Sequence, residues 1–162
     1  RPCVKVKDSI VAYGYWSKTA STYPSATGAY LTASAVGINS LPITYGIDQS
    51  IIDNYAAGVY DYSSQLYDGT NTLVMFGHSN KTFGNVRYLQ TGNYITVNGE
   101  GKTLNYQVYY KGICRINDQT LIDINTGAQI RPFHDRTSKD LYLLTCYDSM
   151  PNTDYVIKAK RI

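Results

Sequence analysis

Short apolar segments separated by turn residues run along most of the chain. Tyr94–Val97 and Leu104–Tyr110 are rich in β-branched and aromatic residues, and Asn98-Gly99-Glu100-Gly101 lies between them. An Asn-Gly pair between two such runs is a strong hairpin signal, because both residues adopt positive φ readily. Asp68-Gly69 and Asn125-Thr126-Gly127 supply similar turn signals elsewhere. Several short strands with turns at these intervals predict an all-β barrel or sandwich.

Helical periodicity is weak by comparison. No long segment repeats its apolar residues every three or four positions, so the pattern predicts only short helices. We expect one within Asp48–Gly58 and another within Val4–Tyr15.

Two of the apolar runs each end in a reactive side chain. Leu73–Gly77 leads into His78, and Leu141–Thr145 leads into Cys146, with a polar segment following in each case. Side chains alternate along a strand, so Cys146 shares a face with Leu144 and not with Thr145. A thiol and an imidazole that the fold brings together can act as a nucleophile and its proton partner.

These two segments, with others in the same order, resemble the sortase family of cysteine transpeptidases. The family has a strand ending in Gly-His and a later strand reading roughly Leu-x-Thr-Cys, as the chain has here. The other segments that carry the resemblance are Val36–Ile43, Ala57–Tyr62, Phe83–Leu89 and Gly92–Val97, where Asn93 replaces a commoner Asp. The resemblance implies a closed β-barrel of about eight strands with short helices. We expect it over residues 35–162, with residues 1–34 forming an N-terminal arm or helix packed on the barrel.

The resemblance also implies a reaction. Sortases attach surface proteins to Gram-positive cell walls. The Cys146 thiolate would attack a backbone carbonyl in a Leu-Pro-x-Thr-Gly type sorting signal, and His78 would protonate the departing amine. An amine of a cell-wall precursor or of a pilin lysine would then resolve the thioester. No cofactor is needed, although some relatives use calcium, and nothing here resembles a calcium loop.

The family's arginine, which binds substrate and stabilises the oxyanion, has no obvious counterpart. A gapless alignment of the last strand puts Asp154 in its place, where a carboxylate would oppose both thiolate and oxyanion. Arg161 serves if the alignment slips, and Arg131 or Arg136 are donors from elsewhere. We take Cys146, His78 and Arg161 as the catalytic residues. The expected substrate-binding residues are Thr145 and Arg131.

Two alternatives to a transpeptidase remain open. A cysteine peptidase would use the same nucleophile and transfer the acyl group to water. A sortase-fold domain that binds peptide without turnover would explain Asp154. Sorting motif, amine acceptor, subclass and oligomeric state are not determined by the sequence.

Composition agrees with an extracellular β-protein. The 162 residues include 17 tyrosines, and only 17% are charged, which favours strands over a cytosolic helical protein. A net charge of +3 with scattered basic residues gives no case for nucleic acid. No apolar run reaches the about 18 residues of a membrane span. Because the chain opens at Arg1 without a methionine, we expect it to be part of something longer. The sortase resemblance implies a membrane anchor outside this chain and a location on the outer face of the membrane, at the cell wall.

Three cysteines leave one without a partner under any pairing. Cys3 and Cys114 pair while Cys146 stays free, or Cys114 is a small buried hydrophobe, which we favour. No spacing of cysteine and histidine indicates zinc, so we expect no metal site. His134 lies in a predicted loop and has no support as a catalyst.

Overall fold

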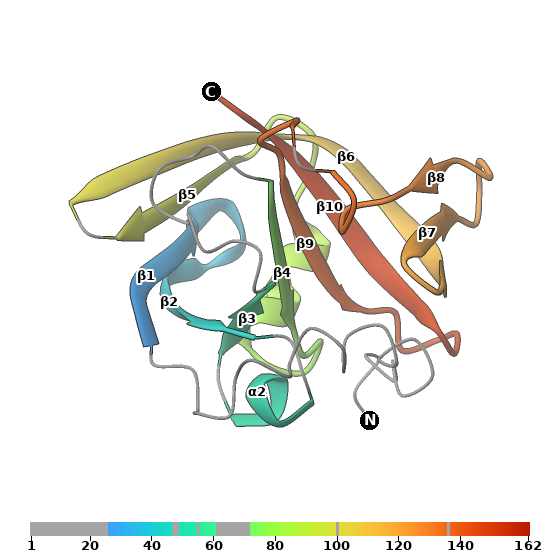
Figure 1. Ribbon diagram of the computed structural model, residues 1–162, viewed down its shortest axis with the longest axis horizontal. Coiled ribbons are helices and arrows are strands. Elements are labelled where there is room, and N and C mark those ends of the chain that lie inside the picture. The colour runs from blue at the N-terminus through green and yellow to red at the C-terminus, as the bar shows by residue number, and fades with distance from the viewer. Residues whose placement is uncertain (1–25, 47–48, 55, 61–71, 100, 136) are drawn as a thin grey trace.

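The computed structural model describes residues 26–46, 49–54, 56–60, 72–99, 101–135 and 137–162, without the side chains of residues 26 and 27. Strands dominate this part of the chain (Figure 1). They are β1 (Ala26–Ala33), β2 (Ile38–Tyr45), β3 (Ala57–Val59), β4 (Leu73–Gly77), β5 (Tyr94–Gly99), β6 (Lys102–Asn117), β7 (Thr120–Asp123), β8 (Gln129–Ile130), β9 (Leu141–Cys146) and β10 (Thr153–Arg161). The helices are η2 (Ser34–Val36), α2 (Gln49–Asn54) and η4 (Thr82–Tyr88).

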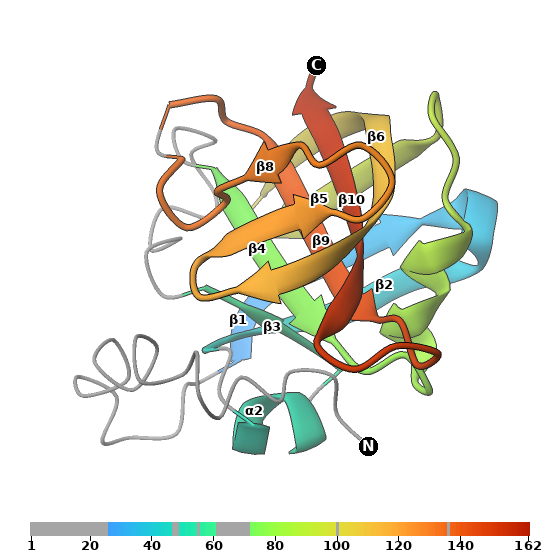
Figure 2. The ribbon, with the colours of Figure 1, turned by 90° about the vertical axis from the view of Figure 1, so that its right-hand side faces the viewer.

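The sheet closes on itself. Its strand order is β10-β9-β4-β3-β2-β1-β5-β6, and β10 also pairs with β6. Within the described ranges this closure gives a barrel of eight strands, so the predicted barrel is confirmed and the sandwich is not. Strands β7 and β8 extend the sheet beyond β6 and cross in front of β9 and β10 (Figure 2).

The predicted hairpin and the first strand define the start of the barrel. Strand β5 pairs with β6 up to Gly99 and Lys102, which confirms the hairpin signal. Strand β1 pairs with both β2 and β5. The barrel therefore begins before residue 35, and the expected domain boundary there is wrong. Residues 1–25, including the helix expected within Val4–Tyr15, lie outside the described residues.

Two apolar clusters lie on opposite sides of the central strands. The barrel interior contains Leu31, Ile43, Met75, Leu143 and Ile157, among others. The second cluster lies on the outer face, and its members come from β4, β9, β10, the β7–β8 extension and the adjoining loops. They include Phe76, Leu144, Val156, Leu121, Ile130 and Phe133. Both faces of β9 are thus covered, which explains why Leu141–Cys146 is apolar at almost every position.

Candidate active site

The structure brings His78 and Cys146 to one edge of the sheet. Strands β4 and β9 are parallel neighbours, in register from Leu73 opposite Leu141 to Gly77 opposite Thr145. His78 follows Gly77 directly, and Cys146 follows Thr145. Parallel strands lie about 4.8 Å apart. The two reactive residues therefore occupy corresponding positions at adjacent strand ends, as the sequence predicted.

Thr145 and Gly77 point away from this site. The Thr145 hydroxyl is buried and donates to the Gly77 carbonyl, 2.9 Å away. A Cβ on Gly77 would lie 2.5 Å from Cγ of Phe83, a buried residue of the barrel interior. The glycine of the Gly-His pair is therefore required by packing. The Thr145 hydroxyl is used by the neighbouring strand, and its role in binding substrate stays a prediction.

An acidic partner of His78 escaped the sequence analysis. His78 Nε2 lies 2.7 Å from Oδ1 of Asp53, in α2. Asp53 is half exposed whereas the His78 side chain is mostly buried. The hydrogen bond with His78 is the main reason why the pKa of Asp53 lies below its usual value. Asp53 is 25 residues from His78 along the chain, so no local pattern links the two residues. The sequence predicted only that Asp53 lies in a short helix.

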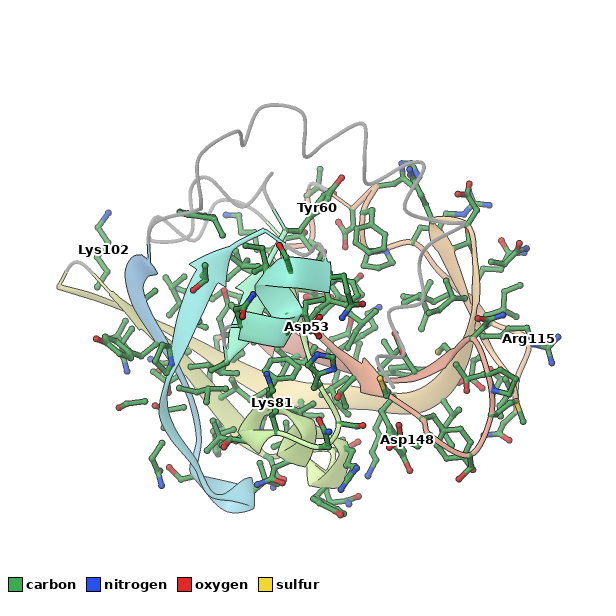
Figure 3. All side chains as sticks on the ribbon, turned by 90° about the horizontal axis from the view of Figure 1, so that it is seen from below. Asp53, Tyr60, Lys81, Lys102, Arg115 and Asp148 are labelled. Atoms are coloured by element: carbon green, nitrogen blue, oxygen red, sulfur yellow. The ribbon has the colours of Figure 1, made fainter. Side chains whose placement is uncertain are left out.

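Polar contacts also tie together the segments around the two strand ends. The Ser79 hydroxyl, next to His78, donates to both carboxylate oxygens of Asp148, at 3.1 and 2.9 Å. Lys81 Nζ donates to the Asp53 carbonyl at 2.5 Å. Figure 3 views the barrel from this end, with Asp53 and Lys81 close together. These contacts link the loops that follow His78 and Cys146 to each other and to α2.

The state of the cysteines excludes one of the two expected arrangements, the pairing of Cys3 with Cys114. Cys114 is free and buried, and burial raises the pKa of its thiol to about 11. This confirms Cys114 as a small buried hydrophobe and rules out its pairing with Cys3, which itself lies outside the described residues. Cys146 is disulfide-bonded, not free. Reduction must therefore precede any nucleophilic chemistry at Cys146.

Asp154 lies where the family resemblance calls for an arginine. It is directly opposite Cys146 in the antiparallel β9–β10 ladder, so the gapless alignment of the last strand matches the structure. Its side chain is fully buried. Neither carboxylate oxygen has a hydrogen-bond partner. Burial raises its pKa to about 7.

Arg161 is far from the two reactive residues. The β9–β10 ladder runs from Asp154 opposite Cys146 to Ala159 opposite Leu141, and Arg161 lies beyond that end. At about 3.3 Å per residue, this is more than about 20 Å along the strand. Arg161 instead covers Tyr106, with Cζ 5.4 Å from the ring centre. The expectation that Arg161 completes the site is therefore wrong.

The other candidate arginine is on the outer face but not beside Cys146. Arg131 is exposed, and its Nη2 donates to Gln129 Oε1 at 3.1 Å. Together with His134, Asp135, Tyr142 and Lys158, it lines a pocket of about 340 Å³. Tyr142 belongs to the start of β9, whereas Cys146 ends it. Arg131 thus lies near the start of β9, away from the Cys146 thiol at its end. Arg136 lies outside the described residues.

Two further properties concern metals and membranes. Within the described ranges, no group of His, Cys, Asp and Glu side chains is arranged to hold a metal ion. No helix in this part of the chain combines the length and apolarity needed to cross a membrane.

The fold and the site define a closed β-barrel protein with a cysteine and a histidine at adjacent strand ends. Residues 31–162 match the family model described as "Sortase domain". The chain belongs to the sortase family. The family and fold support a sortase-type transpeptidase in general, and sortases act on surface proteins at the cell envelope.

Solved structures of sortases share the fold. Sortase A of Listeria monocytogenes has a TM-score of 0.67 at 15% identity, covering 85% of this chain and 88% of its own. A lid mutant of Corynebacterium diphtheriae sortase A gives 0.63 at 20% identity, with 90% and 74% covered. Clostridium perfringens sortase C with the C-terminal cell wall sorting motif gives 0.63 at 19%, with 99% and 89% covered. No curated protein matches the sequence. At these identities the likeness concerns the fold alone.

Proposed function

We propose that this domain is a cysteine transpeptidase that cleaves a Leu-Pro-x-Thr-Gly type sorting signal and joins it to an amine. The observation that carries the proposal is the β4–β9 register, which puts His78 and Cys146 at adjacent strand ends. Family membership supports the same reaction class. The acceptor is an amine of a cell-wall precursor or of a pilin. We place the domain on the outer face of the membrane, with an anchor outside this chain and no metal or organic cofactor.

The chemistry requires only groups of this site and the substrates. The reduced Cys146 thiolate attacks the carbonyl carbon, and the tetrahedral intermediate collapses as the carbon–nitrogen bond breaks. His78, as imidazolium, gives its proton to the leaving amine, so a thioester and a neutral imidazole remain. The acceptor amine then attacks the thioester and gives a proton back to His78. The new amide forms as the thiolate leaves.

Asp53 is the positioning residue in this proposal. Its carboxylate accepts a hydrogen bond from His78 Nε2–H across 2.7 Å. A carboxylate at this distance holds the ring in one orientation. The other ring nitrogen, Nδ1, then remains for the proton transfer at Cys146 and the amine.

The test uses the reduced domain, because Cys146 is disulfide-bonded in this structure. A panel of sorting-signal peptides is incubated with and without hydroxylamine, and products are identified by mass spectrometry. A peptide hydroxamate and a thioester on Cys146 are the expected products. Cys146→Ala should abolish the adduct, and His78→Ala should lower turnover by about two to four powers of ten. Equal turnover in either variant would overturn the assignment.

Thiol labelling supplies a control that needs no substrate. Iodoacetamide should label Cys146 after reduction, and more slowly in the His78→Ala variant, because a neighbouring cation favours the thiolate. Cys114 should stay unlabelled in the folded domain, since it is buried and its thiol pKa is raised to about 11. A Cys114→Ser variant confirms which cysteine carries the label.

A second candidate function is a sortase-fold domain that binds peptide without turnover. Asp154 opposite Cys146 favours it, because a carboxylate offers nothing to an oxyanion. A third is a cysteine peptidase, in which water resolves the thioester. Peptide binding without hydroxamate formation would identify the peptide-binding domain. Hydrolysis with no transfer to any added amine would identify the cysteine peptidase.

A further inference from the structure

Side chains form a row across neighbouring strands next to the proposed nucleophile. Asp123 of β7 is the cross-strand partner of Cys114 of β6. Cys114 is in turn opposite Asp154 of β10. Asp154 is opposite Cys146 of β9. Directly opposed residues in antiparallel strands share a face, with Cβ atoms about 4.5–5.5 Å apart. Asp154 and Cys146 are therefore direct cross-strand neighbours on one face of the sheet.

Asp154 differs from the other acid of this row in its hydrogen bonds. Asp123 accepts from the Tyr110 hydroxyl at 2.5 Å and from the amides of Asn125 and Thr126. Asp154 is fully buried, and neither of its oxygens has a partner. A buried polar group without a partner is rare in folded proteins, and functional sites account for many of the exceptions. The Asp154 carboxyl group makes no hydrogen bond that would stabilise the fold.

The environment of Asp154 favours the neutral acid. An isolated carboxylate in an apolar interior is strongly disfavoured, so such groups keep their proton. Burial accordingly raises the pKa of Asp154 to about 7. A neutral carboxylic acid is a hydrogen-bond donor, whereas its carboxylate can only accept. Enzymes use neutral buried acids in this way to stabilise oxyanions.

We propose that Asp154, as a neutral acid, donates a hydrogen bond to the oxyanion that forms when Cys146 attacks the substrate carbonyl. The inference rests on the proposed function and gives Asp154 the part that an arginine has in the family resemblance. When the thiolate attacks, the carbonyl π electrons move to oxygen, and the Asp154 O–H donates to that oxygen. The proton stays on Asp154, and the hydrogen bond weakens when the intermediate collapses to the thioester. Charge develops beside a donor that is already in place, which lowers the barrier.

Two titratable residues are directly opposite Asp154, namely Cys114 of β6 and Cys146 of β9. Asp123 of β7 is one strand further along the row, and Tyr110 contacts both Cys114 and Asp123. His78 follows the end of β4, next to the end of β9. Ionised Asp123 and a Cys146 thiolate both oppose a charge on Asp154, whereas His78 as imidazolium favours one. The donor is lost as the pH rises through the range in which Asp154 ionises.

The experiment compares reduced wild type with Asp154→Asn and Asp154→Ala, using Leu-Pro-x-Thr-Gly peptides and hydroxylamine. Asparagine keeps a neutral N–H donor of similar size, and alanine removes the donor. We expect Asp154→Asn to stay within about tenfold of wild type and to hold its rate to higher pH. Asp154→Ala should lose about two to three powers of ten. Asp154→Ala should melt no lower than wild type, since it removes a buried polar group without a partner.

The outcomes separate the inference from the proposed function. If wild type forms no hydroxamate or thioester, the proposed function fails, and the inference fails with it. If wild type reacts and Asp154→Ala is equally fast or faster, the inference alone is overturned. The inference alone is also overturned if the rate of Asp154→Asn falls as far below wild type as that of Asp154→Ala. Iodoacetamide labelling of reduced Cys146 in both variants shows that the site is still formed.

Discussion

Asp53 and His78 are 25 residues apart in the chain, yet their side chains meet at 2.7 Å between Oδ1 and Nε2. Helix α2 carries Asp53 across the end of the barrel where β4 delivers His78. Gln49 also donates to Asp53 Oδ1 from the preceding turn of α2, at 2.7 Å. The carboxylate is therefore held in place on both sides.

We expect Asp53→Ala to lower kcat with little change in KM. The imidazole stays in place but loses the anion that orients it, so the loss should be smaller than the about two to four powers of ten for His78→Ala. Asp53→Glu should recover part of the rate. Asn54→Ala, on the same helix, is the control, because the Asn54 amide donates to the Ser50 carbonyl and not to Asp53. Steady-state kinetics with the reduced domain measure the effect; a raised KM with unchanged kcat would contradict a positioning role.

The free energy of unfolding should fall as the pH rises, because the buried Asp154 carboxyl group ionises. The carboxyl ionises near 3.8 in the unfolded chain but near 7 in the folded domain. Folding therefore takes up a proton between these pH values, and the free energy of unfolding declines across that window. Each pKa unit is worth about 1.4 kcal/mol, so the decline is about 4 kcal/mol at most. Thermal unfolding of wild type and Asp154→Asn from pH 4 to 8 measures it. Asp118→Asn, the same change at an exposed turn, is the matched control; parallel curves for all three proteins would refute the assignment.

Gly77→Ala should destabilise the barrel and displace His78. The new methyl would lie 2.5 Å from Cγ of Phe83, and overpacking of this kind costs about 1–3 kcal/mol. Adding Phe83→Leu makes room, so the double variant should lose less stability than the sum of the single changes. Denaturant unfolding of the three variants completes the cycle. Strict additivity would show that the glycine is not required by Phe83.

Arg161→Ala should leave kcat unchanged. The residue lies at the end of β10 remote from Cys146 and stacks on Tyr106, so its loss should affect only stability. Arg161 is partly buried, with Nη1 enclosed, and a cation over an aromatic ring contributes about 0.5–2 kcal/mol, more as it is desolvated. Lys160→Ala, its exposed neighbour, is the control. A fall in kcat as large as that of His78→Ala would return Arg161 to the active site.

The local pattern determined the elements and the two reactive residues. Alternation, Asn-Gly chemistry and the apolar run Leu141–Cys146 predicted strands, a hairpin and a thiol at a strand end. These signals depend on residues that are close in sequence, where backbone preference and burial leave a direct mark. Family resemblance added the barrel closure, and the pairing of β10 with β6 confirmed it.

The tertiary structure alone decided what surrounds the thiol. The β9–β10 register puts Asp154 beside Cys146 and carries Arg161 to the far end, whereas the sequence left both assignments open. The packing of α2 against the barrel end brings Asp53 to His78. The hydrogen bond from the Thr145 hydroxyl to the Gly77 carbonyl likewise depends on the pairing of β9 with β4. Cross-strand partners and burial depend on residues far apart in the chain, so no local pattern encodes them.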